Sequence, residues 1–286
     1  MRKFLGATVL FISILLLAAC GSNEDTLSKI QDEGVVKIGF ANEKPYAYEE
    51  DGELKGAAVD IAKAVFKELG VDEVDPHLAE FGDLIAGLDA GRFDVVTAGM
   101  AITPDRCENV IFGEPEMKYG EGLVVPKGNP LDLHSYEDIA NNPDITVSIM
   151  QGATEIGFVQ EMGVDEDQIK SAPDIPATFS DVESGRADVT TATEMTLKMA
   201  LLSADNDDIE FVEDFEQPDV EGNPSYGSAA FKQGEEELVE AYNEALQKLK
   251  DDGTVAELLE ENYFDPVDNF PEEEVTAEKV CEGEFY

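Results

Sequence analysis

Arg106 is the residue whose type and position point most directly to a binding chemistry. It ends the segment Gly99-Met100-Ala101-Ile102-Thr103-Pro104-Asp105-Arg106, where an apolar run stops at a glycine and a Thr-Pro turn follows. A glycine lets the backbone approach a bound molecule, and the planar guanidinium group of an arginine can hold a carboxylate through two parallel hydrogen bonds. The segment therefore predicts a carboxylate site around Gly99, Ala101 and Arg106. An arginine that caps a helix or forms a surface ion pair is the alternative.

Two other segments carry acidic and aromatic side chains. In Ala41-Asn42-Glu43-Lys44-Pro45-Tyr46, the Glu43 carboxylate suits N–H donors and the Tyr46 ring suits a delocalised cation. Phe81, in Glu80-Phe81-Gly82, is a candidate aromatic wall. A solvated glutamate, a packed rim tyrosine and a core phenylalanine are the competing interpretations. With Arg106, these residue types predict a site for a small zwitterion.

The sequence contains no recognisable catalytic set. No Ser or Cys nucleophile has a partnered His, no Gly-rich phosphate loop is present, and the many carboxylates follow no pairing pattern. His77 and His134 stand apart, without the spacing of metal ligands. We therefore expect a binding protein with no metal and no cofactor.

The segments around these residues alternate between strand and helix patterns. Val35–Phe40 is apolar and β-branched, as in a buried strand, and Ala57–Leu69 places Ile61, Val65 and Leu69 on one helix face. We expect further strands at 93–98, 123–126, 146–150, 189–192 and 229–231, and further helices at 84–88, 136–140, 155–162, 236–251 and 255–262. This alternation predicts an α/β fold with mostly parallel sheets.

An internal repeat indicates two similar lobes. Residues 91–99 read GRFDVVTAG and residues 185–193 read GRADVTTAT, each after an expected helix and leading into an expected strand. Chance similarity between two helix–glycine–strand turns is the alternative. Two α/β lobes enclose a cleft, and ligands gather at the carboxyl ends of the strands. We therefore expect 99–106, Thr193 and Glu194 to face that cleft.

The lobe limits follow from the repeat and from the helical segments near the end of the chain. We expect lobe 1 at 26–122 and 229–286 and lobe 2 at 127–223, with two hinge strands near Leu123 and Ala229. Such lobes usually close around a ligand by hinge motion.

The first twenty residues have the pattern of a targeting segment. Arg2 and Lys3 precede an apolar run that ends in Leu17-Ala18-Ala19-Cys20, which is typical of a secretory signal. The cysteine after Leu-Ala-Ala matches the lipobox of bacterial lipoproteins. We therefore expect residues 1–19 to be a signal peptide, Cys20 to carry lipid and 20–25 to be a linker, so that the lipid alone anchors the protein to the outer face of the cell membrane. A signal peptide with a chance cysteine is the alternative; the run is shorter than the ~20 residues that span a bilayer.

The charge balance is strongly acidic. Removal of residues 1–19 takes away Arg2 and Lys3, which leaves 17 basic and 64 acidic residues and a net charge of −47. This charge disfavours nucleic acid and anionic lipid as partners, because phosphates would be repelled. It favours a halophilic surface, since at ~1 M salt the Debye length falls to about 3 Å and screens self-repulsion. An acidic protein without a salt preference is the alternative.

Three cysteines remain to be assigned. Because lipid would occupy Cys20 and the compartment is oxidising, Cys107 and Cys281 are expected to form a disulfide bond. That bond would tie the C-terminal tail to the middle of the first lobe.

Across nearly the whole mature chain, the sequence resembles family 3 of the extracellular solute-binding proteins, which serve ABC importers of polar amino acids. Within that family it is most similar to proteins that bind ectoine and hydroxyectoine. The segments that carry the similarity are 38–43, 80–82, 87–94, 103–108 and 133–138, and the last two are the most specific. The resemblance implies a two-lobed periplasmic-binding-protein fold and a monomer that delivers its ligand to an importer permease.

The resemblance also implies roles for single residues. Arg106 stands where the family holds the ligand carboxylate, and Glu43 matches the acid that faces the ring nitrogens of ectoine. Two aromatic residues, Tyr46 and Phe81, stand where ectoine-binding proteins stack rings around the ligand. The second-lobe loop that also contacts the carboxylate is matched by Gly152 and Thr154.

Two positions depart from the pattern. Thr193 stands where the amino-acid-binding members have an aspartate for the ammonium group, which disfavours an ordinary amino acid. Ala101 stands where ectoine-binding proteins often have another aromatic residue, which leaves one wall open and allows hydroxyectoine or a bulkier relative.

Three other functions compete with an ectoine-binding protein. A polar amino-acid-binding protein with an altered ammonium site is the nearest. Some relatives resemble dehydratases that act on cyclic acids, and Glu43 or Glu194 would then be the acid–base candidate. A ligand-sensing receptor module is disfavoured because no signalling domain is recognisable.

Overall fold

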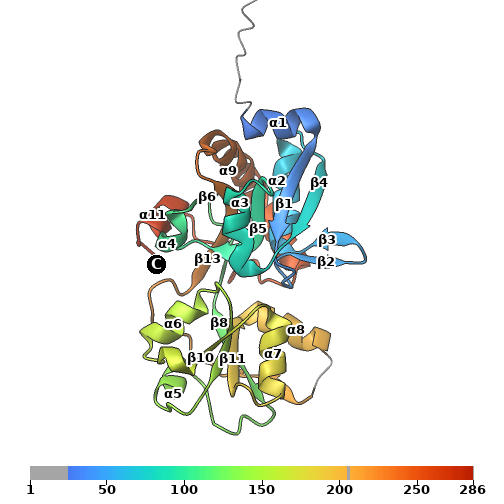
Figure 1. Cartoon of the computed structure of the whole chain (residues 1–286). Coiled ribbons are helices and arrows are strands. Elements are labelled where there is room, and N and C mark those ends of the chain that lie inside the picture. Colours follow the sequence, from blue (N-terminus) through green and yellow to red (C-terminus); the bar gives the residue numbers. More distant parts are fainter. Residues whose placement is uncertain (1–24, 205–206, 286) are drawn as a thin grey trace, which may run out of the picture.

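The computed structural model describes residues 25–204 and 207–285. The expected signal peptide and Cys20 lie outside these residues. The described chain folds into two lobes, each built on its own β-sheet (Figure 1). The predicted α/β, two-lobed fold is confirmed.

The first sheet has the strand order β4-β1-β5-β13-β6, and β7 also pairs with β13. Strand β1 runs parallel to β4 and β5, whereas β13 runs antiparallel to β5, β6 and β7. The strands are β1 (Val35–Phe40), β4 (Glu73–Leu78), β5 (Val95–Ala101), β6 (Val110–Phe112), β7 (Met117–Tyr119) and β13 (Ser225–Lys232). A separate hairpin joins β2 (Tyr48–Glu50) and β3 (Glu53–Lys55). The carboxyl ends of β1 and β5 therefore lie next to each other.

Helices pack on this sheet through apolar faces. The buried side chains of α2 include Ile61 and Val65, as the helical pattern predicts, and they join a core with Phe231 and Tyr242. The helices of this part of the chain are α1 (Thr26–Glu33), α2 (Ala57–Glu68), η1 (Phe81–Asp83), α3 (Leu84–Asp89), α4 (Pro104–Cys107), α9 (Glu236–Asp251), α10 (Thr254–Glu261) and α11 (Ala277–Cys281).

The second sheet has the order β10-β9-β11-β8-β12. Strand β9 is parallel to β10 and β11, and β8 is antiparallel to β11 and β12. The elements are β8 (Glu121–Pro126), α5 (Tyr136–Ala140), β9 (Val147–Met150), α6 (Glu155–Glu161), η2 (Glu166–Gln168), β10 (Ile169–Ala172), α7 (Ile175–Glu183), β11 (Val189–Thr193), α8 (Glu194–Ala204) and β12 (Ile209–Phe211). Helix α7 is the helix expected before residues 185–193, for which no bounds were predicted, and α8 was not anticipated from the sequence.

The internal repeat has the same local structure in both lobes. Asp94, before β5, accepts a hydrogen bond from the backbone N–H of Lys37 at 3.0 Å. Asp188, before β11, accepts one from the backbone N–H of Thr146 at 2.8 Å. Each aspartate thus ties the strand it precedes to the neighbouring parallel strand.

The chain passes between the sheets twice. It leaves the first sheet after β7 and enters the second with β8, and it returns between β12 and β13. By strand pairing, Glu121 and Gly122 lie in the second sheet and 225–228 in the first. The lobe limits expected from the sequence differ slightly, because they assign Glu121 and Gly122 to lobe 1 and begin its second part at 229. The passages nevertheless lie beside the expected hinge positions, and we keep the two-hinge arrangement as a proposal.

The C-terminal helix is bonded to the first lobe. Cys107 and Cys281 form a disulfide across a sequence separation of 174 residues, which confirms the expected pairing. The bond joins α11 to α4 (Figure 1). Within the described residues, no helix is both long and apolar enough to span a membrane.

Candidate functional site

A cavity lies between the lobes at the ends of the strands. The cavity has a volume of about 430 Å³, including the part open to solvent. The first lobe contributes Glu43, Tyr46, Phe81, Ala98, Gly99, Ala101, Arg106 and Tyr119, and the second contributes Met150, Ala153, Thr154, Glu155, Thr191, Ala192 and Thr193. A space of this size favours a compact ligand.

Arg106 is held at the wall of this cavity by backbone carbonyls of both lobes. Its side chain donates to Ala101 O at 2.7 Å and, across the cleft, to Gly152 O at 2.8 Å. Helix α4 carries the residue: the Thr103 hydroxyl caps the helix by accepting from the Arg106 backbone N–H at 3.2 Å. The two carbonyls fix the plane of the guanidinium group, which has five N–H donors in all.

A chain of hydroxyl groups crosses the cleft twice. Tyr46 donates to Thr193 at 3.0 Å, and Thr193 donates to Thr196 at 2.9 Å. Thr196, on α8, then donates to the Glu43 carboxylate at 2.5 Å. The chain therefore begins and ends in the first lobe and passes through the second.

Three aromatic rings line the cavity. The Tyr46 ring is 2% exposed and makes edge contacts with Tyr119 and Phe264, at centroid distances of 5.3 and 5.2 Å. The Arg106 guanidinium lies 5.5 Å from the centroid of the Phe81 ring. Gly99 is required here, because a Cβ atom at this residue would lie 2.2 Å from the Tyr46 ring. Tyr119 thus adds a ring to the expected Tyr46 and Phe81.

Two carboxyl groups, those of Glu43 and Glu155, line the cavity, and a third, that of Glu121, lies beside Glu155. Burial raises the pKa of Glu43 to about 7, although the Thr196 hydrogen bond opposes the shift. Burial also raises the pKa of Glu155 and, well above its ordinary value, that of Glu121. The Glu121 and Glu155 side chains are 1% and 3% exposed, so both carboxyls are withdrawn from water.

The structure brings most of the expected site residues to one cavity. Eight of them line it, namely Glu43, Tyr46, Phe81, Gly99, Ala101, Arg106, Thr154 and Thr193. Gly152 is not in the lining; its carbonyl accepts from Arg106, and an added Cβ would lie 2.9 Å from Gly82 Cα. Glu194 is not in the lining either, and its carboxylate pairs with Lys198.

Three contributors were missed in the sequence. Glu155 directly follows Thr154, after β9, and the same strand-end argument could have found it. Tyr119 and Glu121 lie where β7 leads into β8. Both strands run antiparallel to their partners, so the expectation that ligands gather at the carboxyl ends of parallel strands does not single out these residues.

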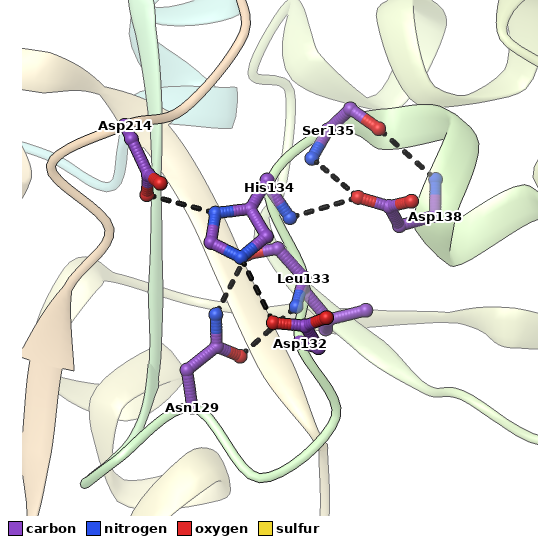
Figure 2. Close-up of polar contacts among 7 residues, drawn as sticks. All are labelled: Asn129, Asp132, Leu133, His134, Ser135, Asp138 and Asp214. Carbon is purple, nitrogen blue, oxygen red and sulfur yellow. Dashed lines mark hydrogen bonds and ion pairs between the residues drawn. The ribbon is translucent and has the colours of Figure 1, made fainter.

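His134 belongs to a structural cluster at the start of α5. Its ring nitrogens contact Asp214 at 2.8 Å and Asp132 at 3.2 Å, and Figure 2 shows the ring between these two carboxylates. The His134 carbonyl also accepts from the Glu216 backbone N–H. The cluster therefore fastens the segment after β12, which returns to the first lobe. Among the described residues, no group of three or more His, Cys, Asp or Glu side chains is placed to hold a metal ion.

Comparison with known proteins gives the family. Residues 36–266 match the bacterial extracellular solute-binding proteins, family 3. The chain is a family 3 solute-binding protein. This family 3 protein is 37% identical over 258 residues to a probable amino-acid ABC transporter periplasmic-binding protein, y4tE, of Sinorhizobium fredii, covering 88% of this chain and 83% of that protein. The resemblance inferred from the sequence is therefore confirmed at the level of the family.

Solved structures show a range of ligands within the same fold. The crystal structure of EhuB in complex with hydroxyectoine matches with a TM-score of 0.80 and 35% identity, covering 90% of this chain and 98% of that one. An ancestral amino acid-binding protein, AncCDT-1, described as a precursor of cyclohexadienyl dehydratase, matches with a TM-score of 0.71 and 30% identity, covering 84% of this chain and 100% of that one. The family 3 protein is thus the solute-binding component of an ABC transport system. Its ligand has to be inferred from the chemistry of the site.

Proposed function

We propose that this protein captures ectoine or hydroxyectoine outside the cell and delivers it to the permease of an ABC importer, held at the membrane by lipid on Cys20. The observation that carries the proposal is the cavity lining: Arg106 and Glu43 lie in one compact space with the rings of Tyr46, Phe81 and Tyr119. Ectoine combines a carboxylate with a cyclic amidinium whose charge is spread over a flat fragment.

Each part of such a ligand has a matching group in the cavity. Arg106 suits the carboxylate because a guanidinium fork binds it bidentately. Ring faces attract a delocalised cation, and carboxylates accept its N–H groups. The similarity to the hydroxyectoine complex of EhuB supports this assignment.

A polar amino acid is the second candidate ligand. The relative from Sinorhizobium fredii is described as a probable amino-acid transporter component, and Glu155 offers a carboxyl near Thr193. Thr193 itself has no carboxylate for an ammonium group.

We infer that the protein binds its ligand without converting it. Glu43, with a pKa raised to about 7, is the acid–base candidate that an enzyme would use. Its oxygen is already engaged by Thr196, at 2.5 Å. Ligand recovered unchanged after hours with the protein supports binding alone, whereas a new product would indicate an enzyme.

The direct experiment is mass spectrometry of the ligand released from denatured protein that was purified without refolding. Calorimetric titration with ectoine, hydroxyectoine and a panel of amino acids then ranks the ligands. If an ordinary amino acid binds more tightly than ectoine and hydroxyectoine, the ligand assignment is wrong and the family assignment stands.

Variants test the site itself. Arg106→Ala should weaken ectoine binding by about 2–5 kcal/mol, because the carboxylate loses its partner in a dry site; this is roughly 30-fold to several thousand-fold in Kd. Tyr46→Leu should cost less: about 0.5–2 kcal/mol for the lost ring face and about 1 kcal/mol for the lost hydrogen bond to Thr193. The control is Arg186→Ala, which removes an arginine that pairs with Asp181 outside the cavity. Unchanged binding by Arg106→Ala would refute the site.

A fourth variant addresses ligand class. Thr193→Asp should improve the binding of an α-amino acid, because it adds a carboxylate partner for the ammonium group. It should not improve ectoine binding, because a carboxylate cannot donate to Thr196 as the Thr193 hydroxyl does.

A further inference from the structure

Glu121 is a buried acid, only 1% exposed, whose carboxyl oxygens accept no hydrogen bond from an N–H group or a hydroxyl group of the described residues. Its carboxyl lies within hydrogen-bonding reach of Glu155, which lines the cavity. Two ionised carboxylates are both acceptors and repel each other. The contact therefore requires that the two side chains share a proton.

The surroundings place that proton on Glu121. Burial raises the pKa of Glu155 as well, but its carboxylate accepts from the backbone N–H groups of Glu155 and Thr193 and faces the positive charge of Arg106, and these contacts favour its ionised form over that of Glu121. Glu121 is desolvated and repelled by the charges of Glu155 and Glu43, so its pKa is raised well above its usual value. Glu121 is therefore the neutral partner, and its O–H donates to Glu155.

Other titratable groups surround the pair on every side. They are Glu43 and Tyr46 after β1, Arg106 on α4, Tyr119 on β7 and Tyr136 on α5. Burial raises the pKa values of the three tyrosines well above 10.0, so these residues stay neutral. Arg106 and Glu155 therefore balance each other in charge, and Glu121 keeps its proton.

We propose that the Glu121–Glu155 pair accepts the cationic group of the ligand, and that the arriving cation displaces the shared proton. This inference rests on the proposed function, in which the cavity binds a zwitterion. The O–H bond of Glu121 breaks, the proton leaves to the buffer, and the N–H groups of the ligand replace it as donors to two ionised carboxylates. Glu155 would contact the ligand, and Glu121 would be a specificity-determining residue behind it.

Proton release on binding tests the proposal. The enthalpy of ectoine binding is measured by calorimetry at several pH values from 5.5 to 8.5 in buffers of different ionisation enthalpy, and the dependence gives the number of protons released. Because Glu43, with a pKa of about 7, is present in the parent and in Glu121→Gln alike, the difference between the two proteins reports on the acid pair. We expect this difference to approach one proton per ligand at a pH where Glu121 is protonated before the ligand binds. Ectoine binding without proton release would overturn the proposal.

Glu121→Gln is the decisive variant, because an amide still donates to Glu155 but cannot lose a proton. It should abolish the proton release that comes from the pair and weaken binding roughly 10- to 100-fold, the range for a hydrogen bond to a charged group. The matched control is Glu116→Gln: Glu116 is also buried, its pKa is raised to about 7, and it accepts from Tyr242 away from the cavity. This control should leave affinity and proton release unchanged.

Two outcomes separate the failure of this inference from failure of the proposed function. If Glu121→Gln binds ectoine as tightly as the parent and with the same proton release, the pair has only a structural role. If ectoine does not bind but an amino acid such as L-arginine does, the proposed ligand is wrong. The same titrations with that amino acid still decide whether the pair releases its proton.

Discussion

The phenolic oxygen of Tyr46 donates a hydrogen bond to the hydroxyl of Thr193, which lies 3.0 Å away in the other lobe. Thr193 passes the donation on through Thr196 to Glu43, so the middle hydroxyls are both donors and acceptors. Such chains polarise each link and strengthen it. Separation of the lobes would break the first and the last bond of the chain together.

Removal of the phenolic oxygen should therefore favour the open arrangement of the lobes. We expect Tyr46→Phe to lose about 1 kcal/mol of binding free energy, the usual net value of one hydrogen bond, which is roughly fivefold in Kd. Calorimetry measures the affinity and small-angle scattering measures the separation of the lobes. The control is Tyr136→Phe, because Tyr136 contacts Thr191 within the second lobe at 2.6 Å. Equal effects of the two substitutions on affinity would contradict the prediction.

The disulfide should contribute both to stability and to affinity. Cys107 directly follows Arg106, and its bond to Cys281 fastens α4 to α11. The Cys107→Ser/Cys281→Ser double variant should lose up to about 5 kcal/mol of unfolding free energy, the limit of the chain-entropy model for a long loop. It should also bind ectoine more weakly, because the short helix that carries Arg106 loses its brace.

Chemical denaturation with and without reductant measures this contribution. The double variant itself is the control, because reductant should leave its stability unchanged. Mass spectrometry of unreduced peptides should find the two cysteines linked in the parent protein. Two freely alkylated thiols in exported protein would exclude the bond.

The acidic surface should make stability depend on salt. Glu236, Glu240 and Glu244 are exposed at successive turns of α9, where like charges destabilise a helix. We expect the melting temperature of the mature protein to fall as sodium chloride is lowered from molar concentration to ~10 mM, because screening of the negative charges weakens. Potassium chloride at equal ionic strength should act alike. A melting temperature that stays flat or rises on dilution would contradict the halophilic interpretation.

His134 should link stability to pH. Hydrogen bonds to Asp132, and to a smaller extent to Asp214, raise the pKa of His134 above 6.5. The folded protein therefore binds the proton more tightly than the unfolded chain does. This stabilisation is fully present below about pH 6.5 and is lost as pH rises through the folded value. The difference in melting temperature between the parent and His134→Gln should therefore shrink from pH 5.5 to pH 8.5.

A second variant checks the cause of that dependence. Asp214→Asn removes one of the two carboxylates and should reproduce part of the pH-dependent loss. A constant difference between parent and His134→Gln across the pH range would show that packing, rather than charge, carries the effect.

The parts of the site that follow strand ends could be predicted from the sequence. Glu43 comes after β1 and Arg106 after β5, and these strands are parallel neighbours, so their carboxyl ends meet at one edge. The repeat placed Thr193 at the matching edge of the second sheet. Local pattern was sufficient here because strand direction alone fixes where each loop lies.

Other parts depend on contacts that no local pattern encodes. Tyr119 and Glu121 reach the cavity region from an antiparallel passage between the sheets, and Thr196 reaches Glu43 only because α8 packs against the cleft. Glu194 follows β11 as the rule requires, but its side chain turns to Lys198 on the same helix. The direction in which the Glu194 side chain leaves the helix keeps it out of the cavity, and the sequence pattern does not reveal that direction.

The disulfide bond that holds α4 also bears on when the binding site becomes complete. Thiols stay reduced in the cytosol and pair in oxidising compartments, so the Cys107–Cys281 bond forms only after export. A newly made chain inside the cell would lack the bond beside Arg106, and by the prediction above it should hold solute more weakly. Formation of the bond would then couple maturation of the binding site to export.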